Sequence, residues 1–133
     1  MAGGASELTP LASRLRKAML KIDGVVESPG IFGEGDAFWV NGKQMANFIA
    51  EDRIEIRMTR REISARRDAL RGDPRVTLRG SSDWVSVRFV TANDLSFVTD
   101  LAEAAASVYR APSGTTPAPP PEGAKLARMR RFH

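Results

Sequence analysis

The chain of 133 residues contains no cysteine, and its single histidine, His133, is the last residue. The lack of cysteine excludes disulfide bonds, thiolate catalysis and sulfur-ligated metal sites. Without an internal histidine, the chain cannot form a Ser-His-Asp triad and lacks the side chain best suited to proton transfer near neutral pH. The catalytic inventory is therefore thin, and we predict no metal site and no cofactor.

The chain also lacks long apolar segments. No run approaches the roughly 18 residues that a membrane-spanning helix requires. The first residues, M-A-G-G-A-S-E-L-T-P, have neither the basic start nor the apolar middle of a secretory signal. We therefore expect no membrane span and a cytoplasmic location.

Little of the net positive charge belongs to the predicted fold. Residues 111–133 contribute +3 of the total charge of +4, which leaves +1 for the rest. A strongly basic DNA-binding domain would carry its charge in the fold. Four cations of the tail are either solvated or dock onto an acidic protein, a nucleic acid or a membrane surface: Lys125, Arg128, Arg130 and Arg131.

Residues 37–61 predict three antiparallel strands joined by two-residue turns. Asn41-Gly42 is typical of a type I′ turn, because both residues tolerate a positive φ. A second turn is predicted at Glu51-Asp52, and the two registers agree. The first turn places Phe38 opposite Met45 and Trp39 opposite Gln44, and the second places Asn47 opposite Ile56. Together they place one apolar set on the core face: Phe38, Val40, Met45, Ile49, Ile54, Ile56 and Met58. They also predict that Asn47 lies on this face, as a hydrogen-bonded structural amide or in a small pocket.

A second hairpin is predicted from residues 75–79 and 84–90, in which polar and apolar side chains alternate. The connecting turn pairs Leu78 with Val85 on the core face. It also places Arg79 directly opposite Trp84 on the other face, close enough for the guanidinium to lie on the indole.

Helices are predicted after Thr9, after Thr59 and after Thr91, and the second of them is short and basic. The order of elements is typical of an α+β fold, a two-layer sandwich. We expect an antiparallel sheet of about five to six strands with two long helices packed on one face. The predicted organisation is a flexible N-terminus (1–8), a single domain (9–110), and a Pro-rich disordered tail (111–133) with a basic end.

The loop at residues 29–36, P-G-I-F-G-E-G-D, is rich in glycine. It is not a phosphate-binding loop, because no Lys-Ser/Thr pair follows and the next predicted element is a strand. We interpret it as a wide connection with Ile31 and Phe32 tucked onto the core, or as a lid over a ligand.

Alternation places aromatic and cationic residues, among them Phe48, on the sheet face away from the helices. Such faces resemble the platforms that stack bases or bind flat anionic ligands. Arginine stems that cover the aromatic rings, or a homodimer through this face, would explain the same pattern. The candidate ligand-binding residues, including the amide of the core face, are Trp39, Asn47, Arg57, Arg79, Trp84 and Arg88.

Four segments resemble the small luciferase-domain family, a group of mostly uncharacterised bacterial proteins classed with the fungal luciferases: E-S-P-G-I-F-G, A-F-W-V-N-G-K-Q-M-A-N-F, I-E-I-R-M-T-R-R-E-I and S-S-D-W-V-S-V-R-F. The resemblance spans about Leu15 to Tyr109. It implies cofactor-independent oxygenation of a pyrone-type substrate, an activity of the fungal branch. The family tends to carry histidines after G-[KR]-x-[FM]-A, where this chain has Asn47 and Ile49.

Three functional hypotheses follow. The first is a small non-catalytic module that binds a ligand, a nucleic acid or a protein. The second is a cofactor-independent oxygenase, a luciferase-like enzyme acting on a small aromatic substrate. The third is an accessory protein that acts through its tail. Since the family histidines are replaced, we favour the binding module over the enzyme.

Overall fold

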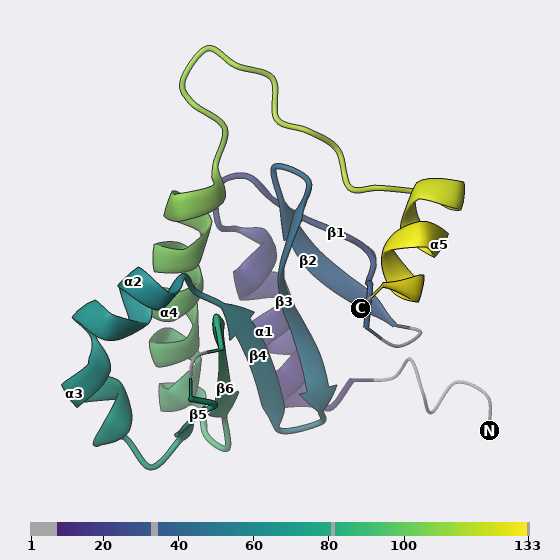
Figure 1. The fold of residues 1–133 in the computed structure, drawn as a ribbon. Helices are drawn as coiled ribbons and strands as arrows, with labels where there is room; N and C mark the ends of the chain where they lie inside the picture. Colours follow the sequence, from purple (N-terminus) through teal and green to yellow (C-terminus); the bar gives the residue numbers. More distant parts are fainter. Residues whose placement is uncertain (1–7, 33–34, 81, 133) are drawn as a thin grey trace.

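A six-stranded antiparallel sheet and five helices form the part of the chain that the computed structural model describes, residues 8–32, 35–80 and 82–132 (Figure 1). The predicted flexible N-terminus lies outside the described residues except for Leu8. The helices are α1 (Pro10–Leu20), α2 (Arg60–Ala65), α3 (Arg67–Arg71), α4 (Ala92–Tyr109) and α5 (Gly123–Arg131). The strands are β1 (Val25–Pro29), β2 (Asp36–Val40), β3 (Lys43–Ala50), β4 (Arg53–Arg57), β5 (Val76–Leu78) and β6 (Trp84–Arg88).

The strands follow the order β1-β2-β3-β4-β6-β5, and every neighbouring pair is antiparallel. The turn between β2 and β3 is the predicted one, with φ of 48° at Asn41 and 77° at Gly42. Trp39 lies opposite Gln44, as expected. The hairpin of β5 and β6 also has the predicted register, because Leu78 lies opposite Val85.

Two irregularities shift the predicted register of β3 by one residue. Phe38 lies opposite Ala46 rather than Met45, because the pairing shifts between Phe38 and Trp39. A second shift lies between Phe48 and Ala50, just before the Glu51-Asp52 turn, so that Asn47 lies opposite Glu55 rather than Ile56. An extra residue in one strand reverses the face of every residue beyond it.

The shifts correct the predicted core. Ile49 was expected in the core but is 40% exposed. Phe48 was expected on the outer face, but its ring packs edge-on against Phe38 and Phe89, with centroids 5.9 and 6.0 Å away. Asn47 was expected on the core face and lies on the outer one, because its partner Glu55 alternates with the buried Ile54 and Ile56.

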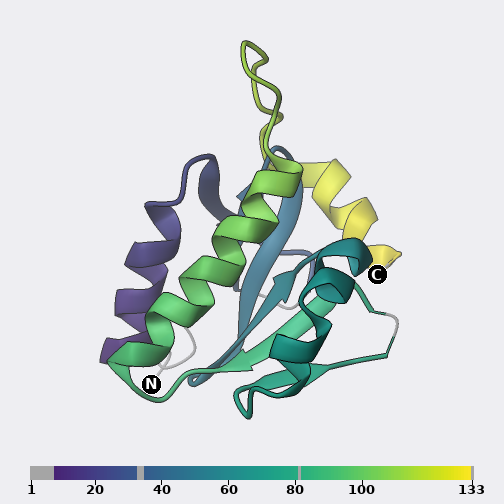
Figure 2. The ribbon, with the colours of Figure 1, turned by 90° about the vertical axis from the view of Figure 1, so that its left-hand side faces the viewer.

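One apolar cluster joins the sheet to α1 and α4. The helices begin at capped residues, since the Thr9 hydroxyl accepts from Ala12 N and Thr91 forms a capping box with Asp94. The two helices also contact each other (Figure 2). The fully buried members of the cluster include Leu15, Met19, Val40, Ile54, Ile56, Val85, Val87, Val98 and Ala102.

The basic helix after Thr59 is two helices, α2 and α3, with a break at Arg66, whose φ is −111° and ψ 13°. Thr59 caps the start of α2, because its hydroxyl accepts a hydrogen bond of 3.1 Å from Glu62 N, which is one half of a capping box. Ile63 and Leu70 are the buried residues of α2 and α3. Both helices lie near β5, the last strand of the sheet (Figure 1).

The helix α5 was not predicted from the sequence. Residues 111–122 form no helix or strand and lead into α5, which lies beside β1 and β2 (Figure 1). Leu126 and Met129 of α5 belong to a second apolar cluster, which is separate from the main core. Among the described residues, no helix combines the length and apolarity needed to cross a membrane.

Candidate functional site

The second apolar cluster covers the end of the outer sheet face. Trp39 is fully buried there by Ile31, Ala37 and Leu126. Its indole Nε1 donates a hydrogen bond to the Ser28 carbonyl over 3.2 Å. The expectation that Trp39 belongs to an open platform is therefore wrong, because α5 packs on it. Burying so large an aromatic ring provides the driving force for docking α5.

The buried side-chain amides of Gln44 and Asn47 lie beside this cluster and are hydrogen-bonded to each other. Gln44 is 1% exposed, and its Oε1 accepts a hydrogen bond of 2.6 Å from Ile31 N. Its Nε2 donates to the Oδ1 of Asn47, which is 7% exposed, over 3.3 Å. Asn47 is thus hydrogen-bonded as expected, although on the other face. The pair fixes the loop after β1 against β3, and so positions Ile31 and Phe32.

A cavity of about 340 Å³ opens on the outer face between this loop, the sheet and α5. Phe32 is 42% exposed rather than tucked onto the core, and its ring meets Trp84 edge-on with centroids 5.7 Å apart. We call this hollow the outer-face cavity. The described residues that line it are Ile31, Phe32, Gly42, Lys43, Gln44, Arg57, Trp84 and Met129.

Arg57 lies directly opposite Trp84 in the pairing of β4 with β6. Its Nε is buried, and the described part of the chain provides no hydrogen-bond partner for it. The ion pairs among the described residues do not include Arg57, and its guanidinium lies 6.0 Å from the centre of the Tyr109 ring. Burial raises the pKa of Tyr109, Arg57 opposes this rise, and Asp83 adds to it. Arg57 is therefore a partly desolvated cation without a counterion among the described residues.

Two other predicted site residues lie outside the cavity. Arg79 forms an ion pair of 3.4 Å with Glu55, and its side chain is 62% exposed. Arg88 pairs with Asp52 over 3.3 Å and is 58% exposed. The expected Arg79 stack on Trp84 is replaced by the contact of Trp84 with Phe32. Of the six predicted residues, the structure brings Arg57 and Trp84 together in the cavity.

The predicted tail cations are exposed on α5: Lys125, Arg128, Arg130 and Arg131. Arg130 also donates from Nε to the Gly30 carbonyl over 3.1 Å. This bond joins α5 to the loop that carries Phe32. The four cations therefore lie on the exposed surface of a helix that is docked on the domain, and not on a free tail.

Sequence reasoning missed Phe32, Lys43 and Met129 as members of the site. The turn register already placed Gln44 opposite Trp39 on the outer face, and Leu126 and Met129 are one turn apart among cations. An apolar pair at that spacing is the signal of a helix that covers exposed aromatic surface. Among the described residues, no group of three acidic, histidine or cysteine side chains could hold a metal ion.

Comparison of the chain with protein-family models, with curated protein sequences and with solved structures gave no match.

Proposed function

We propose that this protein is a small non-catalytic binding module whose outer-face cavity takes a planar aromatic anion. The single observation that carries the proposal is the buried Nε of Arg57, which has no hydrogen-bond partner among the described residues and lies beside an aromatic wall. A buried polar group without a partner costs about 1–3 kcal/mol. A ligand carboxylate or phosphate would supply the missing acceptor and the missing negative charge.

The lining supports recognition at two points. Trp84 and Phe32 offer apolar ring surface for a flat group, and Arg57 and Lys43 offer positive charge. A volume of about 340 Å³ lies within the range of small-molecule sites, roughly 300–1,000 Å³. A single planar group fits this space better than a nucleic-acid strand, because α5 closes one side of the face.

The alternative is a cofactor-independent oxygenase, in line with the resemblance to the luciferase-domain family. The observation that favours it is the same aromatic wall, which would suit a small aromatic substrate. Such chemistry needs a group that accepts a proton from the substrate. Among the described lining residues, neither the lysine nor the arginine meets this need, since both are charged donors without acceptor capacity, and this counts against the enzyme. Oxygen consumption with the bound ligand distinguishes the enzyme from the binding module.

We further infer that α1 and α4 form one helical layer on the sheet. We also infer that the protein acts in the cytoplasm. Finally, we infer that it folds as one luciferase-like domain. The shared apolar cluster of α1, α4 and the sheet supports the first statement. The lack of a membrane-crossing helix among the described residues is compatible with the second.

Isothermal titration with naphthoate tests the proposal, with naphthamide as the uncharged analogue and cyclohexanecarboxylate as the non-aromatic one. We expect naphthoate to bind most tightly, because it alone offers both charge and a flat ring. Arg57→Gln should weaken binding roughly tenfold, the effect of one charge-assisted hydrogen bond. Arg53→Gln is the matched control, since Arg53 is exposed on the same strand and does not line the cavity.

Equal binding of the three compounds, or equal effects of the two substitutions, would show that the cavity does not select a planar anion. Circular dichroism of both variants checks that the strand pairing is intact.

A further inference from the structure

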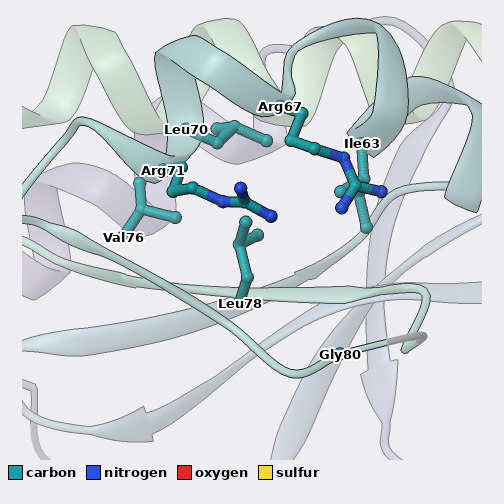
Figure 3. Close-up of a pocket in the computed structure, with 7 residues that line it drawn as sticks. All are labelled: Ile63, Arg67, Leu70, Arg71, Val76, Leu78 and Gly80. Atoms are coloured by element: carbon teal, nitrogen blue, oxygen red, sulfur yellow. The ribbon is translucent and has the colours of Figure 1, made fainter.

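A second hollow, of about 350 Å³, lies at the opposite edge of the sheet between α2, α3 and β5 (Figure 3). Its floor is aliphatic, with Ile63 and Leu70 buried and Val76 and Leu78 half-buried. Arg71 extends over this floor toward Leu78, and Arg67 extends toward Ile63 (Figure 3). We call it the edge groove. It shares no residue with the outer-face cavity.

The rim of the edge groove is strongly cationic. Residues 60–71 contain five arginines and only two acidic residues. Arg66 forms an ion pair with Glu62. Arg67 and Arg71 are exposed and are absent from the ion pairs among the described residues. At a spacing of four residues, they lie on the same side of the helix, one turn apart.

The strand beside the groove has an open edge. β5 pairs with β6 on one side and is the last strand in the described sheet. Arg88 N donates to the Arg75 carbonyl over 2.8 Å. Backbone groups in an antiparallel pair alternate in direction, so those of Thr77 point to β6 and those of Val76 and Leu78 point to the open edge. Val76 N–H donates to the Asp73 carbonyl, which leaves the Val76 carbonyl and the Leu78 N–H facing this edge.

We propose that the edge groove binds an extended, acidic peptide segment of a partner protein, which pairs with β5. Extended peptides commonly add to a free sheet edge, where the main chain gives affinity and alternate side chains enter pockets. The aliphatic floor takes the apolar side chains of the segment, and Arg67 and Arg71 take its carboxylates. A nucleic acid is the less suitable occupant, because the described residues that line the groove include no aromatic ring on which a base could stack.

The test uses the full chain and a blocked nine-residue peptide in which valine and leucine alternate with glutamate. Binding is followed by fluorescence anisotropy at about 0.15 M salt, where the Debye length is about 8 Å. A peptide with glutamine in place of glutamate removes the charge, and one with a central N-methylated backbone removes the edge pairing. We expect each change to weaken binding at least about fivefold, since both the ion pairs and the main-chain bonds contribute.

The protein variant is Arg67→Gln combined with Arg71→Gln, which should weaken the acidic peptide by roughly five- to thirtyfold. The matched control is Arg60→Gln combined with Arg61→Gln, which removes the same charge from exposed positions outside the groove. The control should change the affinity less than about twofold, because more distant charges are screened by salt.

Three results would overturn the proposal. The first is no binding of the acidic peptide at millimolar concentration. The second is an equal loss in the two double variants, which would indicate general attraction to positive charge. The third is tighter binding of a single-stranded oligothymidylate than of the peptide, with the same dependence on Arg67 and Arg71, which would assign the groove to nucleic acid. Failure of naphthoate to bind the outer-face cavity would leave this proposal unaffected.

Discussion

Replacement of Leu126 by alanine should release α5 from the sheet. Leu126 is 7% exposed and packs with Ile31, Ala37 and Trp39. A nine-residue helix is marginal by itself in water, so its stability depends on this packing. A buried leucine replaced by alanine costs about 2–5 kcal/mol. We expect the free energy of unfolding to fall by about 2 kcal/mol, the lower end of this range, because α5 can undock instead of leaving a cavity in a fixed structure.

The assay combines thermal unfolding with tryptophan fluorescence in a Trp84→Phe background, so that Trp39 alone reports. At roughly 4 °C per kcal/mol for a domain of this size, Tm should fall by about 8 °C. The emission of Trp39 should shift to the red and the indole should become accessible to acrylamide, since Leu126 of α5 packs in the cluster that buries this ring. Lys125→Ala is the control, because Lys125 is exposed on the same helix.

Equal Tm values for Leu126→Ala and Lys125→Ala, with unchanged Trp39 emission, would refute the docking of α5. The tail would then be dispensable for folding, as its composition alone suggests. Deletion of residues 112–133 gives the same test without assigning the effect to one side chain.

Three further changes test the packing and the electrostatics. Backbone N–H donors just before α4 hold the pKa of Asp94 below its usual value. The ionised carboxylate therefore stabilises the fold above about pH 4, and this contribution is lost as the pH falls further. In urea unfolding at several pH values, Asp94→Asn should reduce the loss of stability at acid pH. Gly42→Ala should cost about 1–2 kcal/mol, because φ is 77° and the added Cβ would lie 3.1 Å from Ala118, whereas Gly35→Ala has open space and should be nearly neutral in the same assay. Asn47→Ala should cost about 1–3 kcal/mol by chemical denaturation, because it leaves the buried Gln44 Nε2 without its acceptor.

Turn chemistry was sufficient to predict much of the fold. The Asn41-Gly42 turn, the threonine caps and the alternation in β5 and β6 are local signals, and the structure has the elements where these signals place them. The bulges of β3 were not predictable in this way. The residue pattern along β3 is compatible with a regular strand and with a bulged one. The packing of Phe48 against Phe38 and Phe89 selects the bulged strand.

The candidate site was predicted only in part for a related reason. Alternation placed Trp39, Arg57 and Trp84 on the outer face correctly, since the extra residues at both register shifts lie in β3 and leave the alternation along β2, β4 and β6 unbroken. It could not show that α5 covers Trp39 while leaving Trp84 beside a cavity. Which part of a face stays open depends on contacts between residues far apart in the chain. The Pro-rich composition of the tail predicted disorder, although the spacing of Leu126 and Met129 is compatible with a docked helix.

We propose that Arg57 binds an anionic ligand in the outer-face cavity. The most direct measurement is the ¹H–¹⁵N signal of the Arg57 Nε–H group during a titration with naphthoate, assigned by comparison with Arg57→Gln. We expect a downfield shift of this proton that saturates with binding, because the buried Nε–H gains an acceptor. The claim is contradicted if naphthoate binds and this signal stays in place, or if naphthamide produces the same shift.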